Sequence, residues 1–374
     1  MAKRNFIAEA LCRLGGDKYT QAGTQAALRD ALQEAQKNIV PFDIHNDKWI
    51  LFSDLHKGAK NRANDFRRCE ASYVAALNHY FEKGYSLCVM GDAEELWEEF
   101  PRSVIRKNDA ALAAEKRFHD EGRYLRLWGN HDEIWSDPKI VSRLLQPSYG
   151  ERRLSVPESI LLEATDGDRT LGSILLIHGH QGTQNTGKNT GYSKWVLRNV
   201  WRPIQVVTGL SCNTPATDWK LRRDRDKIIY QWAASQAGLV LIAGHTHAPV
   251  FASYNHRARL ATELSIARSN IAALSEERRN EELGRIEKLS SDLHTLESRL
   301  SAEERLESEP LQNPLPCYFN TGCCSFEDGD ITGIEMSEGR IRLVRWPDDN
   351  RQPFRKVLQS ESLSRVFTHL QERA

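Results

Sequence analysis

The chain of 374 residues lacks any excess of charge, because 51 Lys and Arg residues balance 51 Asp and Glu residues. Nucleic-acid-binding domains are usually basic, so this balance gives no support to a nucleic-acid partner. Cysteine is also scarce: there are seven cysteines, an odd number, and no Cys-x-x-Cys pair. Neither a disulfide framework nor a zinc ribbon is indicated, and a reducing compartment fits this usage best.

Long hydrophobic runs are also missing. The apolar runs of this sequence are far shorter than the roughly 20 residues that cross a bilayer. Near the N-terminus, Phe6-Ile7-Ala8 is followed at once by Glu9, so we do not expect a secretory signal peptide. We therefore expect a cytoplasmic protein without a transmembrane segment, long enough to bury one or two cores.

Five short apolar runs each end directly in residues that can bind metals. Runs of this length, bounded by turn residues, indicate buried strands. The runs and the residues after them are 50–53 with Asp54 and His56, 87–90 with Asp92, 124–128 with Asn130, His131 and Asp132, 174–177 with His178, and 239–243 with His245 and His247. Because functional groups in α/β sheets gather beyond the carboxyl ends of strands, we expect these side chains to meet at one edge.

Helical patterns alternate with the apolar runs, for example at 67–83 and 108–121, and this alternation favours an α/β fold. We divide the chain into an N-terminal helical extension (1–45), a core (46–261), a helical insertion (262–310), and a last segment with the final core strands and a C-terminal tail (311–374). Within the core, 181–237 begins with a polar, glycine-containing loop and continues with recurring Trp and Arg residues. We interpret 181–237 as a helical cap over the site, and ordinary amphipathic helices are the alternative.

The insertion is rich in Ser, Glu, Arg and Leu. Its apolar residues follow coiled-coil spacing in two phases: Leu264, Ala267, Ile271 and Leu274, then Ile286, Leu289, Leu293, Leu296 and Leu300. Between them lie residues 280–284, where we expect either a stutter or a turn that makes a helical hairpin. The segment 262–308 is a candidate for self-association or for binding a protein partner, and a solvated insertion without a partner is the alternative.

The motifs appear in the order Asp-x-His, Gly-Asp, Gly-Asn-His-Asp, a single His and Gly-His-x-His. This ordered set resembles the calcineurin-like metallophosphoesterase family from Asp54 to His247, and 318–322 resembles the family's last core strand. The resemblance implies a four-layer α-β-β-α sandwich, with two mixed sheets flanked by helices, and the helical, coiled-coil-like segment described above would be inserted into it. Gly91-Asp92-x-x-Glu95-x-Trp97 is similar to the branch that contains UDP-2,3-diacylglucosamine pyrophosphohydrolases, which typically have Arg where this chain has His131.

The resemblance also implies two divalent metal ions bridged by Asp92. The first ion would be bound by Asp54, His56 and His247, and the second by Asn130, His178 and His245. His180 is the alternative to His178, because it lies two residues further on. Carboxylate and imidazole ligands without a thiolate suit Mn²⁺, which we favour, and also Fe²⁺, Zn²⁺ or Co²⁺.

By the same resemblance, His131 would lie over the phosphoryl group and either stabilise charge or act as the general acid, the role we favour. Asp132 follows His131 directly, so we expect it to orient the imidazole and raise its pKa. The expected reaction is hydrolysis of a phosphate ester by attack of a hydroxide activated by two metals. The Arg and Trp content of 181–237 favours a phosphorylated small molecule that is a phosphodiester or a nucleotide-like pyrophosphate.

Other interpretations remain open at this point. Any single His can be a structural side chain, and the acidic residues of 94–99 can be the first turn of a helix. The whole chain can also be a catalytically weak scaffold on a phosphoesterase fold, acting through the helical segment 262–308.

Overall fold

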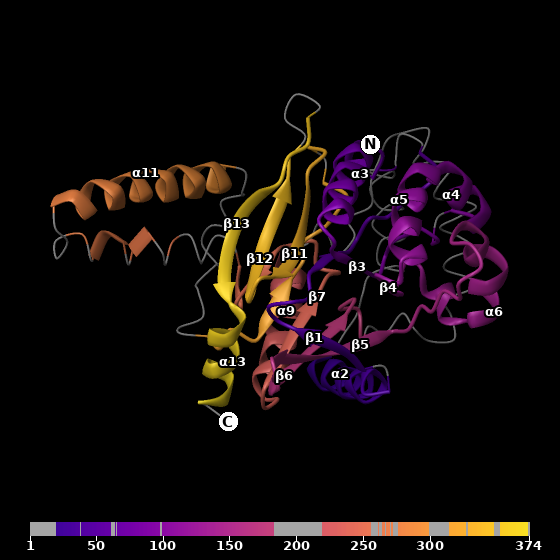
Figure 1. Cartoon of the computed structure of the whole chain (residues 1–374), viewed down its shortest axis with the longest axis horizontal. Coiled ribbons are helices and arrows are strands. Elements are labelled where there is room, and N and C mark those ends of the chain that lie inside the picture. Colours follow the sequence, from indigo (N-terminus) through magenta and orange to yellow (C-terminus); the bar gives the residue numbers. More distant parts are fainter. Residues whose placement is uncertain are drawn as a thin grey trace, which may run out of the picture.

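The computed structural model describes residues 20–37, 39–60, 64, 66–97, 99–182, 219–255, 261, 264–265, 267–269, 271, 276–298, 314–326, 328–347 and 352–372. Within these residues the chain is an α/β protein with two mixed β-sheets and helices packed around them (Figure 1). None of the helices in this part of the chain has both the length and the apolar character that crossing a membrane requires.

One sheet of the described residues has six strands in the order β13-β12-β11-β2-β3-β4. The strands are β2 (Trp49–Phe52), β3 (Ser86–Met90), β4 (Tyr124–Leu127), β11 (Ile331–Ser337), β12 (Arg340–Trp346) and β13 (Lys356–Ser362). The strands β2, β3 and β4 are parallel neighbours, whereas β11 to β13 continue the sheet in antiparallel order. The segments that follow β2, β3 and β4 therefore all leave the sheet at one edge.

The other sheet has seven described strands in the order β1-β5-β6-β7-β10-β8-β9. The strands are β1 (Ile39–Asp43), β5 (Ser159–Asp166), β6 (Arg169–Ile177), β7 (Leu239–Ala243), β8 (Val250–Phe251), β9 (Tyr254–Asn255) and β10 (Tyr318–Asn320). Because β6, β7 and β10 are parallel neighbours, the residues after β6 and after β7 also share one edge.

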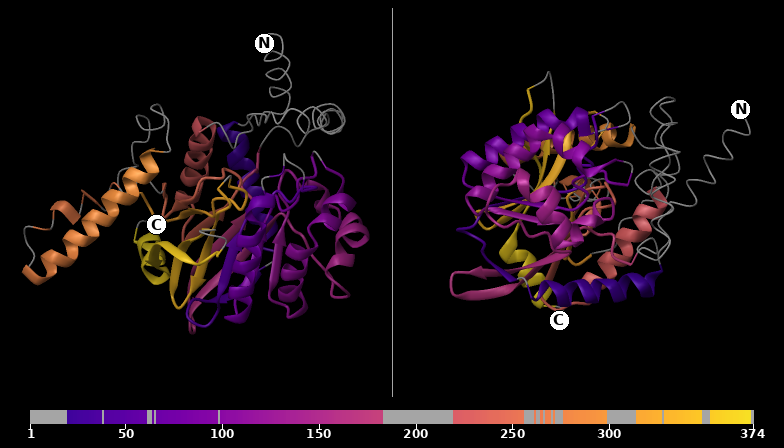
Figure 2. Two further views of the ribbon diagram at one scale, coloured as in Figure 1. Left: turned by 90° about the horizontal axis from the view of Figure 1, so that it is seen from above. Right: turned by 90° about the vertical axis from the view of Figure 1, so that its right-hand side faces the viewer.

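Alternating residues of the six-stranded sheet enter two different cores. Leu51, Cys88 and Met90 pack in one core with residues of the seven-stranded sheet, whereas Ile50 and Val89 face the opposite side. That opposite side is covered by α3 (Phe66–Glu82) and α5 (Asp109–Asp120). The helices α2 (Gln21–Ala35) and α9 (Trp219–Ala234) pack on the seven-stranded sheet (Figures 1 and 2). This arrangement is compatible with a four-layer sandwich.

The N-terminal extension differs in part from its prediction. The described residues 21–35 are helical, as expected, and α2 packs against β5 and α9. Residues Ile39–Asp43, which we predicted within a helical segment, form β1 and pair in parallel with β5 at the edge of the sheet. A strand is reasonable there, because Pro41 disfavours a helix interior and is tolerated in an edge strand. Residues 1–19 lie outside the described residues.

Most of the predicted cap, residues 183–218, lies outside the described residues. Its last part is α9, in which Ile229, Trp232 and Ala233 are buried against the seven-stranded sheet. This part of 181–237 is therefore a helix that packs on the seven-stranded sheet.

The helical insertion projects from the two sheets as an arm (Figures 1 and 2). Its long helix α11 (Glu276–Ser298) runs through 280–284 without a break, so the turn that we considered there is wrong, whereas a stutter, which leaves the helix continuous, agrees with it. Asn280 and Gly284 lower helix propensity, but two such residues do not end a helix of this length. Leu264 and Leu289 pack on each other, with Ile286 and Leu293 beside them, so the segment around residue 264 lies along α11 as in a hairpin. Residues 299–313 lie outside the described residues.

The remaining helices are short. They are α4 (Pro101–Lys107), α6 (Pro138–Ile140) and α13 (Leu363–Gln371), and further helical turns span Glu133–Ser136, Val141–Leu145 and Gln146–Ser148. The described residues between β3 and α4, 91–97 and 99–100, contain no helix, so Glu94 and Glu95 do not form the first turn of a helix.

Candidate metal centre

Three overlapping groups of side chains are positioned to hold a metal ion. They are Asp54, His56 and His247; His56, Asp92 and His131; and Asp92, His178 and His245. In each group the ligand atoms lie within 4.8 Å of one another. Neighbouring groups share His56 or Asp92, so they form one continuous cluster. The cluster lies where β2, β3 and β4 of one sheet and β6 and β7 of the other end.

The backbone at this cluster is unusual. Five predicted ligands have positive φ angles: Asp54 (54°), His56 (48°), Asp92 (49°), His245 (69°) and His247 (55°). Residues other than glycine rarely occupy this left-handed region, and they remain there only where the surrounding structure imposes it. Such strain is typical of functional sites, and here it coincides with the residues that the motif order singled out.

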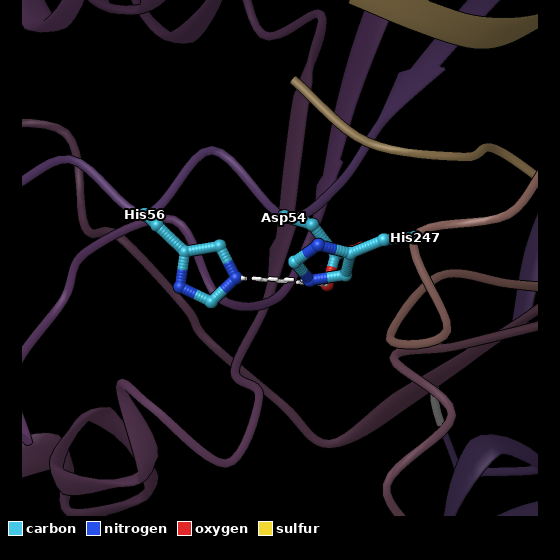
Figure 3. Close-up of side chains that lie close together, drawn as sticks. All are labelled: Asp54, His56 and His247. Atoms are coloured by element: carbon cyan, nitrogen blue, oxygen red, sulfur yellow. Dashed lines mark hydrogen bonds and ion pairs between the residues drawn. The ribbon is translucent and has the colours of Figure 1, made fainter. Parts of the chain in front are cut away.

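In the first group, one carboxylate oxygen of Asp54 is available to bind a metal ion. Its Oδ2 accepts the backbone N–H of His245 at 2.9 Å and the hydroxyl of Ser53, whereas the buried Oδ1 has no hydrogen-bond partner among the described residues. His247 Nε2 lies 3.1 Å from that Oδ1 and 3.2 Å from His56 Nε2. Figure 3 shows the two imidazoles beside the carboxylate. Burial opposes ionisation of Asp54, but the charges of His247 and His178 hold its pKa below the usual value.

Glu95 fixes which nitrogen of His56 carries the proton. Its Oε2 lies 3.1 Å from His56 Nδ1. Because an ionised carboxylate only accepts hydrogen bonds, Nδ1 carries the proton, and in the neutral ring Nε2 carries a lone pair. That lone pair lies among Asp54, His247 and Asp92, and this donor set fits a divalent cation.

Asp92 belongs to two of the three groups. Its Oδ1 accepts the backbone N–H of His131 at 2.8 Å, and its Oδ2 lies 3.1 Å from His178 Nε2 and 3.8 Å from His56 Nε2. Burial raises the pKa of Asp92, but the charges of His178 and His131 outweigh this effect and hold the pKa well below the usual value. The carboxylate is therefore ionised and lies between ligands from both sheets.

The structure brings His178 rather than His180 into the cluster. His178 Nδ1 lies 3.0 Å from the carbonyl oxygen of Met90, so Nδ1 donates, and in the neutral ring Nε2 carries the lone pair. This buried Nε2 has no hydrogen-bond partner among the described residues. His180 belongs to none of the three groups, and its ring centre lies 5.4 Å from that of His178. Burial, followed by the charge of His178, lowers the pKa of His180 to about 3.

Asn130 is buried after β4, as its motif predicted. Its backbone carbonyl accepts the indole N–H of Trp97. Its side-chain Oδ1 is buried and has no hydrogen-bond partner among the described residues. A buried amide oxygen without a partner is unfavourable unless an ion or a water contacts it, so Asn130 also fits a metal ligand.

The carboxylate that contacts the imidazole of His131 is Glu95, which we had not singled out for this role. Glu95 Oε2 lies 2.7 Å from His131 Nδ1, and the ring of Trp97 stacks on His131 with the ring centres 4.2 Å apart. Burial opposes ionisation of Glu95, but the charge and hydrogen bond of His131 hold its pKa below the usual value. The signal was present in the sequence, in the Gly-Asp-x-x-Glu-x-Trp pattern.

Asp132, predicted to orient His131, is used differently. Its two carboxylate oxygens accept the backbone N–H groups of Gly129, at 2.6 Å, and of Ala93, at 2.9 Å. Burial and the neighbouring charges of Asp92 and Glu94 raise its pKa to about 7. Asp132 therefore ties the turn after β4 to the turn after β3.

Glycines precede three of the motifs because the ligands pack against them. A Cβ on Gly129 would lie 2.3 Å from Asp92 Oδ1, and a Cβ on Gly244 would lie 2.5 Å from Asp54 Oδ2. A Cβ on Gly91 would lie 2.8 Å from the ring of His178. The three glycines allow turns from both sheets to approach closely enough for the ligand groups to share members.

Three features of this cluster fit a metal-binding site: the donor set, the buried oxygen and nitrogen atoms without hydrogen-bond partners among the described residues, and the strained backbone. No protein-family model matches this chain, and a search of curated proteins found no match. The functional interpretation therefore rests on the motif order and on the geometry of these residues.

Proposed function

We propose that this chain is a metal-dependent phosphohydrolase of the calcineurin-like metallophosphoesterase type. The observation that carries the proposal is the continuity of the three ligand groups, which share His56 and Asp92. One group alone would suit a single structural ion. A line of groups joined by an ionised carboxylate suits two ions, because a carboxylate can bridge them.

In this proposal the first ion would be held by Asp54, His56 and His247, and Asp92 would connect it to a second ion held by Asn130, His178 and His245. Mn²⁺ is the favoured metal, and Fe²⁺, Zn²⁺ and Co²⁺ also suit nitrogen and oxygen donors. When bound, the two ions would polarise the phosphoryl group and lower the pKa of a water molecule at neutral pH.

His131 is the residue that we assign to proton transfer. Glu95 accepts a hydrogen bond from Nδ1, which stabilises the charged imidazolium, and Trp97 holds the plane of the ring. Nε2 is then the nitrogen that would donate a proton to the leaving oxygen. Glu95 thus takes the orienting role that the sequence had suggested for Asp132.

The substrate proposed is a phosphodiester or a nucleotide-like pyrophosphate. The support is the recurrence of Trp and Arg in 181–237 and the similarity of Gly91-Asp92-x-x-Glu95-x-Trp97 to pyrophosphohydrolases. The scaffold alternative would act through the projecting arm. A scaffold has no need to keep seven ligands, however, and all seven are present.

Metal-stripped protein titrated with Mn²⁺ tests this function. We expect two equivalents per chain, with bis-p-nitrophenyl phosphate or a nucleoside diphosphate sugar hydrolysed faster than p-nitrophenyl phosphate. Asp92→Asn should reduce the stoichiometry, and Asp120→Asn on the exposed face of α5 serves as the matched control. A plateau at one equivalent in the parent would refute the two-metal assignment, and two bound ions without hydrolysis of any of the three esters would favour the scaffold.

A further inference from the structure

Four charged side chains are buried next to the segments that carry the ligands. Lys57, Glu115 and Arg126 are 0 % exposed, and Glu94 is 1 % exposed. Lys57 Nζ lies 2.7 Å from Glu115 Oε1 and 3.2 Å from Glu94 Oε1. The guanidinium of Arg126 pairs with Glu94 and lies 3.8 Å from Glu115 Oε2. We call these four residues the charge network, in which two positive charges balance two negative ones.

Aromatic side chains donate further hydrogen bonds to the two carboxylates. The hydroxyls of Tyr73, Tyr124 and Tyr149 all donate to Glu115, and the indole N–H of Trp135 donates to Glu94. Burial raises the pKa of Glu115, but the charges of Lys57 and Arg126 outweigh this and lower it to about 2. Both carboxylates of the network are therefore ionised, and both accept hydrogen bonds inside the protein.

Each member outside α5 lies in or next to a different ligand segment. Lys57 directly follows His56, and its backbone is hydrogen-bonded to the segment after Asp92, with Lys57 N 2.9 Å from Ala93 O and Glu95 N 3.0 Å from Lys57 O. Glu94 lies in that same segment, two residues after Asp92.

Arg126 is in β4, which leads into Asn130 and His131. Its Nη2 also lies 3.7 Å from Asp132 Oδ2. Glu115 on α5 is the common anchor for Lys57 and Arg126. The network therefore joins all three ligand segments of the six-stranded sheet to one helix.

Stability alone does not explain four buried charges. Removing an ion from water costs several kcal/mol, and apolar replacements of buried ion pairs are often equally stable or more stable. Residues next to Glu115 on α5, such as Ala111, Leu112 and Phe118, are buried and apolar, so an apolar residue would suit this face. Charged groups differ from apolar ones in that their contacts are directional and fix a single arrangement.

We propose that the charge network is a positioning device, which holds the segments of His56, Asp92 and Asn130 in register before any metal binds. This inference rests on the proposed metal site. It assigns Lys57, Glu94, Glu115 and Arg126 a role through the ligands, without contact to substrate or metal.

The test uses the double variant Lys57→Met with Glu115→Gln. It removes one positive and one negative charge, so Arg126 and Glu94 stay paired, and the amide that replaces the Glu115 carboxylate keeps an oxygen for the tyrosine hydroxyls. The matched control is Lys116→Met with Asp120→Asn, which removes the exposed ion pair of the same helix, with its atoms 2.5 Å apart. Mn²⁺ affinity is measured by calorimetric titration, and thermal unfolding and amide hydrogen exchange are measured on metal-free protein.

We expect the Lys57/Glu115 variant to unfold within a few degrees of the parent but to bind Mn²⁺ about 10–100-fold more weakly, as for residues that orient ligands. Amides of 54–58 and 92–96 should exchange faster, and the control should match the parent in all three measurements. Parent-like affinity and exchange would overturn the proposal, and so would a loss of affinity fully accompanied by a loss of stability.

If the double variant does not fold, Arg126→Lys tests the positioning role instead. This substitution keeps the positive charge but removes the planar guanidinium, whose N–H donors have a fixed geometry. Weaker Mn²⁺ binding at parent-like stability would support positioning, and unchanged binding would overturn it. If the parent itself binds no Mn²⁺, the proposed function fails. The hydrogen-exchange comparison then still judges whether the network holds the segments in register.

Discussion

Replacing Gly129 with Ala tests whether the ligands occupy the positions that metal binding needs. A Cβ at this position would lie 2.3 Å from Asp92 Oδ1, 2.6 Å from Asp92 N and 2.8 Å from His178 Cδ2. Carbon atoms in contact normally lie about 3.5–4.0 Å apart, so at least one of the two ligands must move by more than half an ångström. Metal–ligand distances are held within about 0.2 Å, and a shift of this size is therefore not tolerated in the site.

The expected loss has two parts that separate measurements can resolve. Overpacking of a buried position costs about 1–3 kcal/mol of folding free energy, which thermal unfolding in EDTA would detect. Displacement of functional atoms by about 1 Å can reduce function by about 10²-fold, and we expect Mn²⁺ affinity to fall by a comparable factor. Calorimetric titration of the metal-free variant measures that factor.

Gly284→Ala is the control. Gly284 lies in α11, and a Cβ there would meet no atom of the described residues within 4 Å. Alanine is more favourable than glycine inside a helix by roughly 1 kcal/mol, so the control should be as stable as the parent or more stable, with unchanged Mn²⁺ binding. If Gly129→Ala binds Mn²⁺ as tightly as the parent, the close packing of Asp92 and His178 around the site is wrong.

Three further predictions concern other parts of the molecule. His131→Ala should keep the metal and lose about 10²–10⁴-fold in turnover, less for an ester with a good leaving group; loss of bound metal would contradict its assignment to proton transfer. Because the folded-state pKa of Glu115 is lowered to about 2, its contribution to stability is complete above its unfolded value and is lost as the pH falls through the interval down to about 2. In Glu115→Gln, the free energy of unfolding, measured with denaturant, should therefore fall less steeply as the pH is lowered. An unchanged pH dependence would argue against the ion pair with Lys57. Replacing 262–308 by a Gly/Ser linker should leave metal binding and hydrolysis of a small aryl phosphate intact, because the arm pairs with itself; loss of either in a folded variant would mean that the arm helps to form the site.

The cluster of candidate ligands was predictable because its signal is local in the sequence. Each ligand follows an apolar run within a few residues, and strands of one sheet end at a common edge. His178 follows a strand of the other sheet, so the common-edge argument does not extend to it. For Asp54 and Asp92, knowing the run and the residue after it was enough to expect the two side chains close together. No contact between distant side chains had to be inferred for that expectation.

The partners of the ligands were harder to predict, because they depend on turn geometry. Glu95 contacts both His56 and His131, and nothing in apolar periodicity shows which carboxylate of a loop points towards a given imidazole. Asp132 is adjacent to His131 in sequence, but its carboxylate accepts backbone N–H groups of two turns. Adjacency along the chain was therefore a poor guide to contact within the loops.

The turn considered at 280–284 and the conformation of the edge strand β1 were mispredicted for a similar reason. Residues 280–284 contain weak helix formers, yet α11 continues through them, and Leu264 packs on Leu289 further along the same helix. At 39–43, pairing with β5 determines the conformation, and this pairing joins residues more than a hundred positions apart. Local propensity is outweighed in both places by contacts that the sequence does not display.

Five candidate ligands have left-handed backbone conformations, and these conformations need support from neighbouring turns. Residues in such conformations cost on the order of 1–3 kcal/mol each, and five of them together approach the whole stability of a typical domain. A single turn would relax, but here Asp54 N bonds to Gly91 O, His56 N to Asp92 O and Gly244 N to His178 O. Each ligand turn is therefore held by another ligand turn, and relaxation of one would break the backbone hydrogen bonds of its neighbour. The strain can persist in the metal-free chain for this reason, and Asp54 Oδ1 and His178 Nε2 stay directed into the cluster.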